Sequence, residues 1–443
     1  MTTGELERQR PRLGPVRRSK ARLYGWIAVA IWALLLAGVF IVGDHLKKIG
    51  LATEDDLPPL HASTRLLTWQ IVPTACLGAA LAAVLPSLTQ RLSWRRLLPA
   101  SWIAAVLWTV ALAMTDGLDA IHRPLDAPTE YPVGIAAIQA DGPAQWLRTF
   151  TERLGGYTTH VRGHPPLPTL MLWALDETGL HGTAWSSALI IAAGTSAIVA
   201  IAITVRHIAG ETLARRALPF LILAPLTLWI ATSMDAFFLG VGAWATALTA
   251  IASKRTNLPA AAGAGLLLGT LPYLSYGLLS LLAVPLAVVV LTRPSRRVLT
   301  VLLCCAAIVP LAFTAGGFWW PDGVAATHET YLISRGSAQR SYTYFVIANF
   351  AVLALQIGPA TAHALPTMFS RRSPLTWLVG AALAGVVALD VSGVTRGEVE
   401  RIWIPYAAWI VLATAAHAPP ARRWLAAQAA LTLAIQALVL SPW

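Results

Sequence analysis

Long apolar stretches alternate with short polar segments along the chain, and most of the stretches have the length of a membrane-spanning helix. A helix needs about 20 apolar residues to cross the hydrocarbon core of a bilayer. The apolar run 165–175 is shorter, so it predicts a half-helix that is re-entrant or lies at the membrane interface. The longer runs predict thirteen spanning helices, at residues 24–43, 67–88, 98–115, 184–205, 217–232, 236–252, 259–274, 276–292, 298–316, 343–361, 374–392, 402–417 and 424–441.

The composition agrees with a membrane protein and excludes other classes. Of the 443 residues, 56% are hydrophobic and only 12% are charged, whereas a soluble domain has about 25% charged residues. So apolar a chain lacks the polar surface of a soluble protein, and disordered chains show the opposite balance. The residue alternation typical of a transmembrane β-barrel is not seen. The sequence therefore predicts an all-α, polytopic protein with the lipid bilayer as its surroundings.

The distribution of charge gives the predicted helices a direction. Cytoplasmic loops of membrane proteins are enriched in Lys and Arg. With the N-terminus in the cytoplasm, 22 of the 33 Lys and Arg fall in cytoplasmic segments, and 18 of the 21 Asp and Glu fall on the outer side. The formal net charge of +12 is therefore a topology signal, and no nucleic-acid partner is predicted. The basic segment 1–23 precedes an apolar run without a small-residue cleavage site, which predicts a retained first helix in a multi-pass plasma-membrane protein.

The segments between the predicted helices indicate where a functional site can form. The cytoplasmic loops are short and the outer ones are longer, so we expect an active site on the exoplasmic face. Apolar residues at helical spacing over 141–155 predict an amphipathic helix, either on the membrane surface or as a cover for its loop. The predicted regions are a basic cytoplasmic tail at 1–23, two helices at 24–97, a core at 98–316 with the exoplasmic loop 116–183, and a C-terminal helical region at 317–443 with the exoplasmic loops 317–342 and 393–401.

The first candidate site opens the long exoplasmic loop, where Asp116 and Asp119 follow the helix 98–115. If the helix continues, the two carboxylates share one face. Burial near the apolar boundary raises the pKa of a carboxylate, which suits a general base. The alternative is a solvated helix end with a turn at Gly117.

The second candidate lies at 159–168, where prolines precede the short apolar run. Prolines fit the first turn of a helix. The N-terminal end of that helix, with Arg162 and His164 beside it, can bind a phosphate, and His160 is a candidate for contacting a sugar or acceptor. The alternative is a rigid turn with polar flanks.

The third candidate is the segment 394–406, in which four charged residues stand at the mouth of a helix. Arg401 and Arg396 are candidates for binding a lipid phosphate, because a guanidinium binds phosphate through two hydrogen bonds. Glu398 and Glu400 are candidates for contacting a sugar or acceptor. The alternative is that Arg401 pairs with Glu398 three residues away. Asp235, in a short outer turn, is either a turn residue or a further polar contact.

Together these segments resemble the GT-C superfamily of membrane glycosyltransferases, which use polyprenyl-phosphate sugars. The resemblance is carried by an acidic residue at the outer end of an early helix, by the long outer loop, and by the HPPL sequence at 164–167. The segment 396–405 is similar to an actinobacterial branch of sugar transferases, which includes enzymes thought to add methylthioxylose to lipoarabinomannan. Two predicted helices precede the one that opens the loop, and the superfamily often starts directly with that helix.

The resemblance implies a function. An outer-face aspartate, here Asp116 or Asp119, would deprotonate an acceptor hydroxyl of a cell-envelope glycan or glycolipid. The oxygen would attack the sugar, and polyprenyl phosphate would leave. No cofactor is predicted, and no spacing in the sequence supports a metal site. The alternative is a multi-span transporter or flippase of a lipid-linked sugar, although transporters place charged residues at mid-membrane and the predicted helices carry almost none.

Overall fold

The computed structural model describes residues 15–50, 56–333, 337–371 and 373–443. Of the predicted basic tail, residues 1–14 lie outside the described residues. Nearly all regular structure in the described ranges is helical, which confirms the all-α class. The strands β1 (Ser63–Thr64) and β2 (Val439–Leu440) form one short antiparallel pair.

Eight helices in the described part of the chain are long and apolar enough to cross a membrane. Each of them contains or closely matches a span expected from the sequence. They are α2 (Pro15–Lys48), α3 (Ile71–Arg91), α4 (Trp94–Ala113), α9 (Thr183–Ala209), α11 (Met234–Arg255), α14 (Arg296–Ala315), α16 (Tyr342–Ser370) and α17 (Pro374–Val391).

The other five expected spans correspond to shorter or interrupted helices. The continuous helix expected at 217–232 is wrong in its second half, because the α-helix ends at Leu223 and a 3-10 turn starts at Pro225. Ala224 is extended (ψ 141°), since the residue before a proline is driven out of the helical region. The five helices are α10 (Glu211–Leu223), α12 (Leu258–Leu274), α13 (Ala283–Thr292), α19 (Ile404–Ile410) and α20 (Arg422–Leu438).

Short helical segments complete the described fold. One 3-10 turn directly precedes α13 and another directly follows α19. Most of the other short segments lie in the connections between the long helices. The 3-10 turns are Met114–Asp116, Asp119–Ile121, Arg123–Asp126, Tyr131–Gly134, Leu154–Gly156, Pro225–Trp229, Tyr276–Leu282, Ser337–Gln339 and Val411–Ala416, and the short α-helices are α5 (Ile135–Asp141), α6 (Pro143–Thr149), α7 (Thr159–Gly163), α8 (Leu167–Glu177), α15 (Trp320–Ile333) and α18 (Val399–Ile402).

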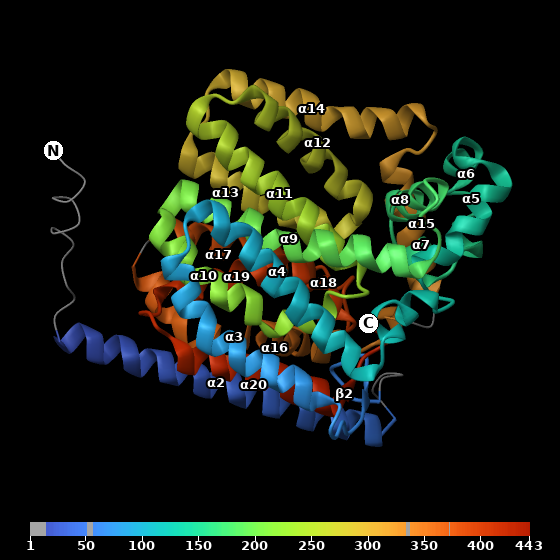
Figure 1. Cartoon of the computed structure of the whole chain (residues 1–443). Coiled ribbons are helices and arrows are strands. Elements are labelled where there is room, and N and C mark those ends of the chain that lie inside the picture. The colour runs from blue at the N-terminus through green and yellow to red at the C-terminus, as the bar shows by residue number, and fades with distance from the viewer. Residues whose placement is uncertain (1–14, 51–55, 334–336, 372) are drawn as a thin grey trace.

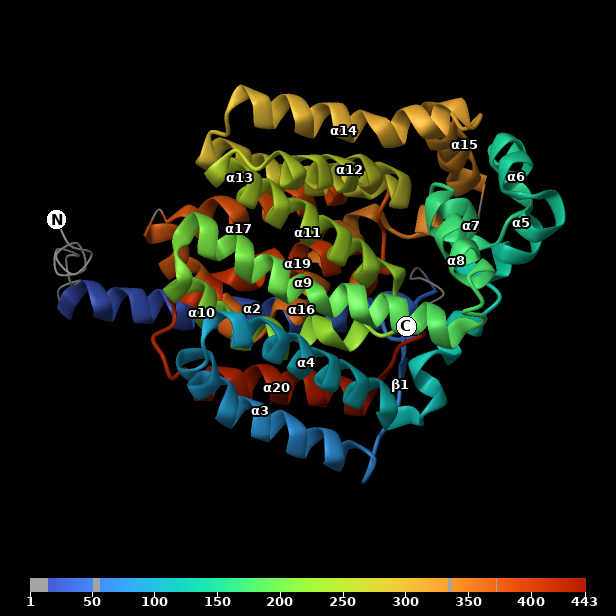
Figure 2. The ribbon, with the colours of Figure 1, turned by 45° about the horizontal axis from the view of Figure 1, so that its top comes forward.

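The long helices lie side by side in one bundle, with α2 and α14 on opposite outer faces (Figures 1 and 2). Small residues let neighbouring helices approach closely. A Cβ at Gly265 or Gly269 of α12 would collide with backbone carbonyls of α14, which is the close packing that a small-xxx-small pattern allows in membranes.

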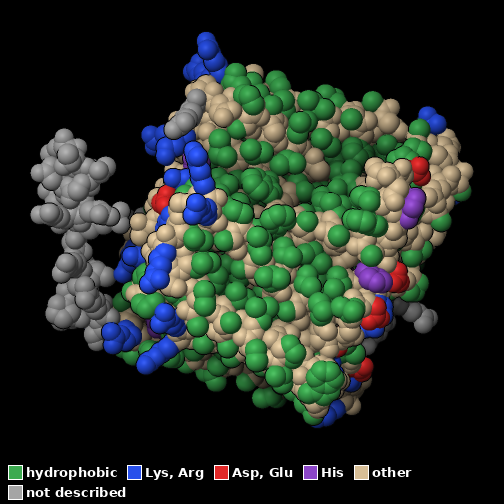
Figure 3. All heavy atoms as spheres, in the orientation of Figure 1, with side chains coloured by type: hydrophobic (Ala, Val, Ile, Leu, Met, Phe, Trp, Pro, Cys, Tyr) green, Lys and Arg blue, Asp and Glu red, His purple; other side chains and the backbone are tan. Residues whose placement is uncertain are grey.

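The bundle presents apolar side chains on its outer faces. On α2, Ile31 and Leu34 are 60% and 72% exposed, and on α14, Leu303 and Leu311 are 63% and 66% exposed. A soluble monomer rarely exposes so large an apolar surface. In Figure 3, most Lys and Arg gather at one end of the bundle, while most of the visible Asp, Glu and His lie toward the other. This separation of charge is what a membrane orientation requires, and which end is cytoplasmic stays a prediction.

The helices α5 to α8 and α15 gather at one end of the bundle, beside the strands β1 and β2 (Figures 1 and 2). The single helix expected at 141–155 is wrong, because α6 covers only Pro143–Thr149 and a separate 3-10 turn follows at Leu154–Gly156. Trp146 and Phe150 are fully buried in a cluster with Phe318. The apolar face of this segment therefore packs inside the protein. We call this group of helices the loop module.

Candidate functional site

Asp116 and Asp119, the two predicted bases, have different surroundings. Asp116 closes a 3-10 turn after α4, and Gly117 (φ 105°) then turns the chain. The helix does not continue, so the two carboxylates do not share a helix face. Asp119 pairs with Arg123 at 2.7 Å, with both side chains more than half exposed. Asp116 is 24% exposed and pairs with Arg65.

Arg65 is held in place beside Asp116 by the end of α20. Its Nε and Nη2 donate hydrogen bonds to the carbonyl oxygen of Gln436, at 3.1 and 2.7 Å. The Gln436 side chain donates in turn to Thr115 Oγ1 at 2.6 Å, next to Asp116. Three separate segments of the chain therefore fix the Asp116 carboxylate at the end of the bundle. Its Oδ1 accepts from Arg65, and Oδ2 accepts no hydrogen bond within the described residues.

A pocket opens in front of this carboxylate. Its cavity volume is about 80 Å³, and it is partly open to solvent. We call it the Asp116 pocket. Both polar and apolar side chains line it, among them Arg65, Asp116, Arg123, Thr232, Gln436 and Trp443.

Arg401 forms a buried ion pair close to this pocket. Its Nη1 lies 3.1 Å from Oδ2 of Asp235, and the two side chains are only 8% and 6% exposed. Nη2 lies 3.6 Å from Glu398, whose other oxygen is 3.4 Å from Arg340. The expected pairing of Arg401 with Glu398 thus exists, but the closer partner comes from the start of α11. Asp235 is both a turn residue, since its N–H donates to Ser233 Oγ, and a partner of the buried cation.

These charges determine one another's protonation. Burial by itself would lower the pKa of Arg401, but the carboxylates of Asp235 and Glu398 outweigh this and raise it. Burial by itself would raise the pKa of Glu398, and the positive charges of Arg401 and Arg340 outweigh it, so this pKa is lowered. Arg401 and Glu398 therefore stay charged over the physiological pH range.

Asn349 of α16 shapes the segment that carries Glu398 and Arg401. Its Nδ2 donates to Asp390 Oδ1 at 2.7 Å and to the Thr395 carbonyl at 2.8 Å, and its Oδ1 accepts from the Gly397 N–H at 3.3 Å. Gly397 (φ 81°) and Glu398 (φ 57°) are both in the left-handed region. A non-glycine residue adopts this conformation only when its surroundings impose it, and the bonds of Asn349 to Thr395 and Gly397 hold the backbone that leads into Glu398.

A second, smaller pocket lies at the Arg401 side chain, with a cavity volume of about 10 Å³. We call it the Arg401 pocket. Two hydrogen-bond donors of residues that line it are buried and have no partner among the described residues, namely Arg401 Nε and the Tyr131 hydroxyl. Unpaired buried donors are costly, so they mark a place suited to an acceptor-rich ligand. The other lining residues include Glu130, His160, Thr232, Asp235, Pro442 and Trp443.

The loop module contributes one wall of the Arg401 pocket. His160 Nδ1 lies 2.9 Å from Glu130 Oε1, and its ring stacks on Tyr131 at 5.6 Å. The Nδ1 of His164 bonds the His160 carbonyl at 3.1 Å, and its ring meets Tyr131 edge-on. Burial, followed by the nearby charges of Arg401 and His160, lowers the pKa of His164 well below its usual value. His160 and His164 thus lie near Arg401, and His164 is neutral.

The remaining predicted residues lie outside the two pockets. Arg162 makes no ion pair or side-chain hydrogen bond within the described residues. The Arg396 side chain donates hydrogen bonds to the backbone carbonyls of Gly393, Ala338 and Arg340. Glu400 is buried and accepts a hydrogen bond from the backbone N–H of His61 at 2.5 Å.

Several members of the site were not singled out from the sequence. Arg65 and Arg340 are basic residues on the predicted outer side, where the positive-inside rule disfavours them, and this signal could have drawn attention to both. Glu130, Tyr131 and Trp443 carry no such signal, because their place depends on how the loop module folds against the bundle. That these residues line the site can be seen only in the structure.

In the described part of the chain, no three His, Cys, Asp or Glu side chains form a group suited to holding a metal ion. Comparisons of the chain with protein-family models, with curated proteins and with solved structures give no match. The chemistry of the two pockets is the remaining guide to function.

Proposed function

We propose that this protein is a glycosyltransferase of the GT-C type in the plasma membrane. It moves a sugar from a polyprenyl-phosphate donor to a glycan or glycolipid acceptor of the cell envelope, on the exoplasmic face. The observation that carries the proposal is that the Asp116 pocket and the Arg401 pocket share a wall, made of Pro124, Thr232 and Trp443. The first contains the Asp116 carboxylate with Arg65 and Arg123, and the second contains the buried Arg401 guanidinium with Asp235 and Glu130.

The Arg401 pocket suits the donor phosphate. Arg401 keeps its charge, and its Nε and the Tyr131 hydroxyl offer donors that no described residue uses. Asp235 and Glu398 orient the guanidinium through its two Nη atoms, which leaves the Nε edge for a ligand. Fixed donors of this kind stabilise the charge that develops on a departing phosphate.

The Asp116 pocket suits the acceptor. The acceptor hydroxyl transfers its proton to the Asp116 carboxylate, and the hydroxyl oxygen forms a bond to C1 of the sugar. The bond between C1 and the phosphate oxygen breaks, and polyprenyl phosphate leaves with the electron pair. Asp116 is the better placed of the two predicted aspartates, because it lines the pocket, whereas Asp119 is more than half exposed and does not line it. Arg65 keeps the Asp116 carboxylate oriented.

The position of the site favours this function over transport of a lipid-linked sugar. A transporter binds its substrate near the middle of the membrane, between broken helices. Here the Arg401 pocket is lined by Glu130, Tyr131 and His160 of the segment that forms the loop module, at one end of the bundle. A lipid-linked donor reaches such a site from the bilayer, so no nucleotide-binding segment is needed in this chain.

The test is sugar transfer by purified protein in lipid nanodiscs. The donors are radiolabelled farnesyl-phosphoryl hexoses and pentoses, and the acceptors are envelope oligosaccharides. We expect Asp116→Asn to lower the rate by about 10²- to 10⁴-fold, as loss of a general base does. The matched control is Asp119→Asn, which removes an exposed carboxylate three residues away and should keep the rate within about twofold.

Two results would contradict the proposal. The first is an absence of transfer from every donor by wild-type protein whose fold is intact. The second is full activity of Asp116→Asn, which would place the base elsewhere. If Asp119→Asn is the variant that loses activity, the assignment moves to that residue.

A further inference from the structure

Trp443 lies between the two pockets and lines both of them. Its ring centroid is 5.0 Å from the guanidinium carbon of Arg401, which is a cation–π contact. The ring also packs against those of His61 and His160, at 5.4 and 5.9 Å. One aromatic side chain therefore separates the proposed phosphate position from the proposed acceptor position.

The backbone before Trp443 is anchored to the segment that carries Arg65. In the β1–β2 pair, Ser63 lies opposite Leu440 and Thr64 opposite Val439. The Arg65 N–H continues the ladder by donating to the Leu438 carbonyl at 3.0 Å. The residue that holds Asp116 and the tryptophan that covers Arg401 thus belong to one hydrogen-bonded unit.

The indole has a further property that points to a ligand. Its Nε1–H is buried and has no hydrogen-bond partner among the described residues. A tryptophan offers a broad apolar face together with one polar donor, and a buried N–H of this kind usually finds an acceptor. A sugar ring presents the matching surfaces, with C–H groups on its faces and hydroxyl oxygens at its edge.

We propose that Trp443 binds the sugar of the donor and sets which sugar the site accepts. This inference rests on the proposed function, because a donor whose phosphate is at Arg401 and whose C1 faces Asp116 has its sugar at the shared wall. The ring of Trp443 contacts one face of the sugar, and Nε1–H donates to a hydroxyl oxygen. Trp443 is thus a specificity-determining residue that contacts the substrate.

The experiment compares two ligands that differ only in the sugar. Binding of farnesyl phosphate and of farnesyl-phosphoryl hexose or pentose to nanodisc-embedded protein is measured for wild type, Trp443→Ala and Trp443→Phe. We expect Trp443→Ala to weaken binding of the sugar-bearing ligand at least tenfold more than binding of farnesyl phosphate. Trp443→Phe keeps a ring and loses the N–H, so its selective loss should be smaller, about threefold. The preference between hexose and pentose should change in both variants.

The matched control is Trp319→Ala, which removes a 54% exposed tryptophan outside both pockets. It should change neither affinity. Equal weakening of both ligands by Trp443→Ala would overturn the inference, because the residue would then only support Arg401. If Trp443→Ala does not fold, Trp443→Phe decides, and an unselective loss or no loss overturns the inference. Intact selectivity with normal transfer refutes the role of Trp443 alone, whereas absence of sugar transfer by wild type refutes the proposed function as well.

Discussion

Arg401 and Asp235 form a 3.1 Å ion pair although they are 166 positions apart in the sequence. The pair connects α18 to the first turn of α11, and both side chains are less than a tenth exposed. Two charges taken out of water are tolerated only when they are well paired. The pair therefore ties the segment 393–401 to the bundle and fixes the position of the Arg401 guanidinium in its pocket.

Breaking this pair should destabilise the protein. We expect Arg401→Ala to lower the free energy of unfolding by about 3–5 kcal/mol, because Asp235 is left buried and unpaired. The double variant Arg401→Leu with Asp235→Leu should recover much of the loss, while farnesyl phosphate binding stays lost. Denaturant unfolding in detergent measures the first effect.

The control for this prediction is Arg123→Ala, which breaks the exposed pair with Asp119. Exposed pairs contribute at most about 1 kcal/mol, so this variant should unfold much like the wild type. Similar losses for Arg401→Ala and Arg123→Ala would contradict the importance of the buried pair.

Asn349 should act on activity without touching a substrate. Asn349→Ala removes three hydrogen bonds that shape the turn at Gly397 and Glu398, so the guanidinium of Arg401 shifts. A misplacement of about 1 Å in a site can cost on the order of 100-fold in rate. We expect a loss of this size in sugar transfer, together with weaker farnesyl phosphate binding.

The comparison variant is Asn257→Ala, which removes the N-cap hydrogen bond of α12. A lost cap costs about 1 kcal/mol of stability, and the transfer rate should be unchanged. If both asparagine variants lower stability but neither lowers the rate per folded molecule, Asn349 has no positioning role.

The fold was largely predictable and the site only in part. Hydrophobic run length locates α2, α4, α9 and α14, because a bilayer-sized helix needs little beyond apolar residues. The break at Pro225 was missed, since a single proline inside an apolar run leaves run length and mean hydropathy nearly unchanged. The four charged residues at the mouth of a predicted helix led to Arg401.

The partners of Arg401 were less accessible from the sequence. Asp235 was read mainly as a turn residue, because its contact depends on a partner 166 positions away. Local spacing could find only the pairing with Glu398. For the same reason, Asp116 and Asp119 remained equivalent in the sequence and differ in the structure, where only Asp116 meets Arg65.

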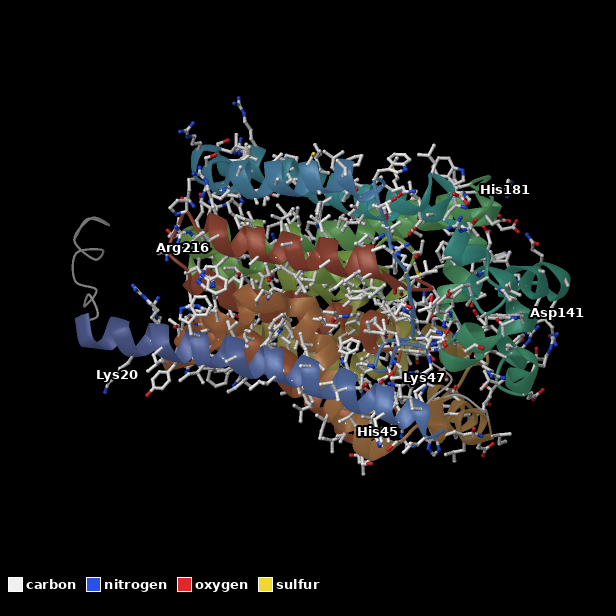
Figure 4. The ribbon with its side chains drawn as sticks, turned by 90° about the horizontal axis from the view of Figure 1, so that it is seen from below. Lys20, His45, Lys47, Asp141, His181 and Arg216 are labelled. Atoms are coloured by element: carbon white, nitrogen blue, oxygen red, sulfur yellow. The ribbon has the colours of Figure 1, made fainter. Side chains whose placement is uncertain are left out.

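The two ends of the bundle should face opposite sides of the membrane. Figure 4 shows Lys20 and Arg216 at one end, and His45, Lys47, Asp141 and His181 at the other. In protein whose native cysteines are replaced by serine, a cysteine at position 181 should react with a membrane-impermeant maleimide from outside intact cells. A cysteine at position 216 should react only after the membrane is opened. The reverse pattern would refute the exoplasmic location of the site.

His164 should make the protein sensitive to mild acid. Its pKa is lowered in the folded state, first by burial and then by the positive charges of Arg401 and His160, although its hydrogen bond to the His160 carbonyl acts in the opposite direction. The unfolded chain takes up a proton on this imidazole below about pH 6.5, and the folded protein resists it. The contribution of neutral His164 is therefore complete above this pH and is lost as the pH falls below it.

The measurement is thermal unfolding of detergent-solubilised protein between pH 7.5 and 5.5. The wild type should lose stability on acidification, and His164→Gln, which cannot be protonated, should lose less. The matched control is His181→Gln, because His181 is 70% exposed and paired with Asp176 at 3.1 Å. Removing this solvent-exposed imidazole should leave the acid sensitivity of the wild type in place. If His164→Gln unfolds with the pH dependence of the wild type, then other groups cause the acid sensitivity, and the neutral imidazole beside Arg401 does not contribute to it.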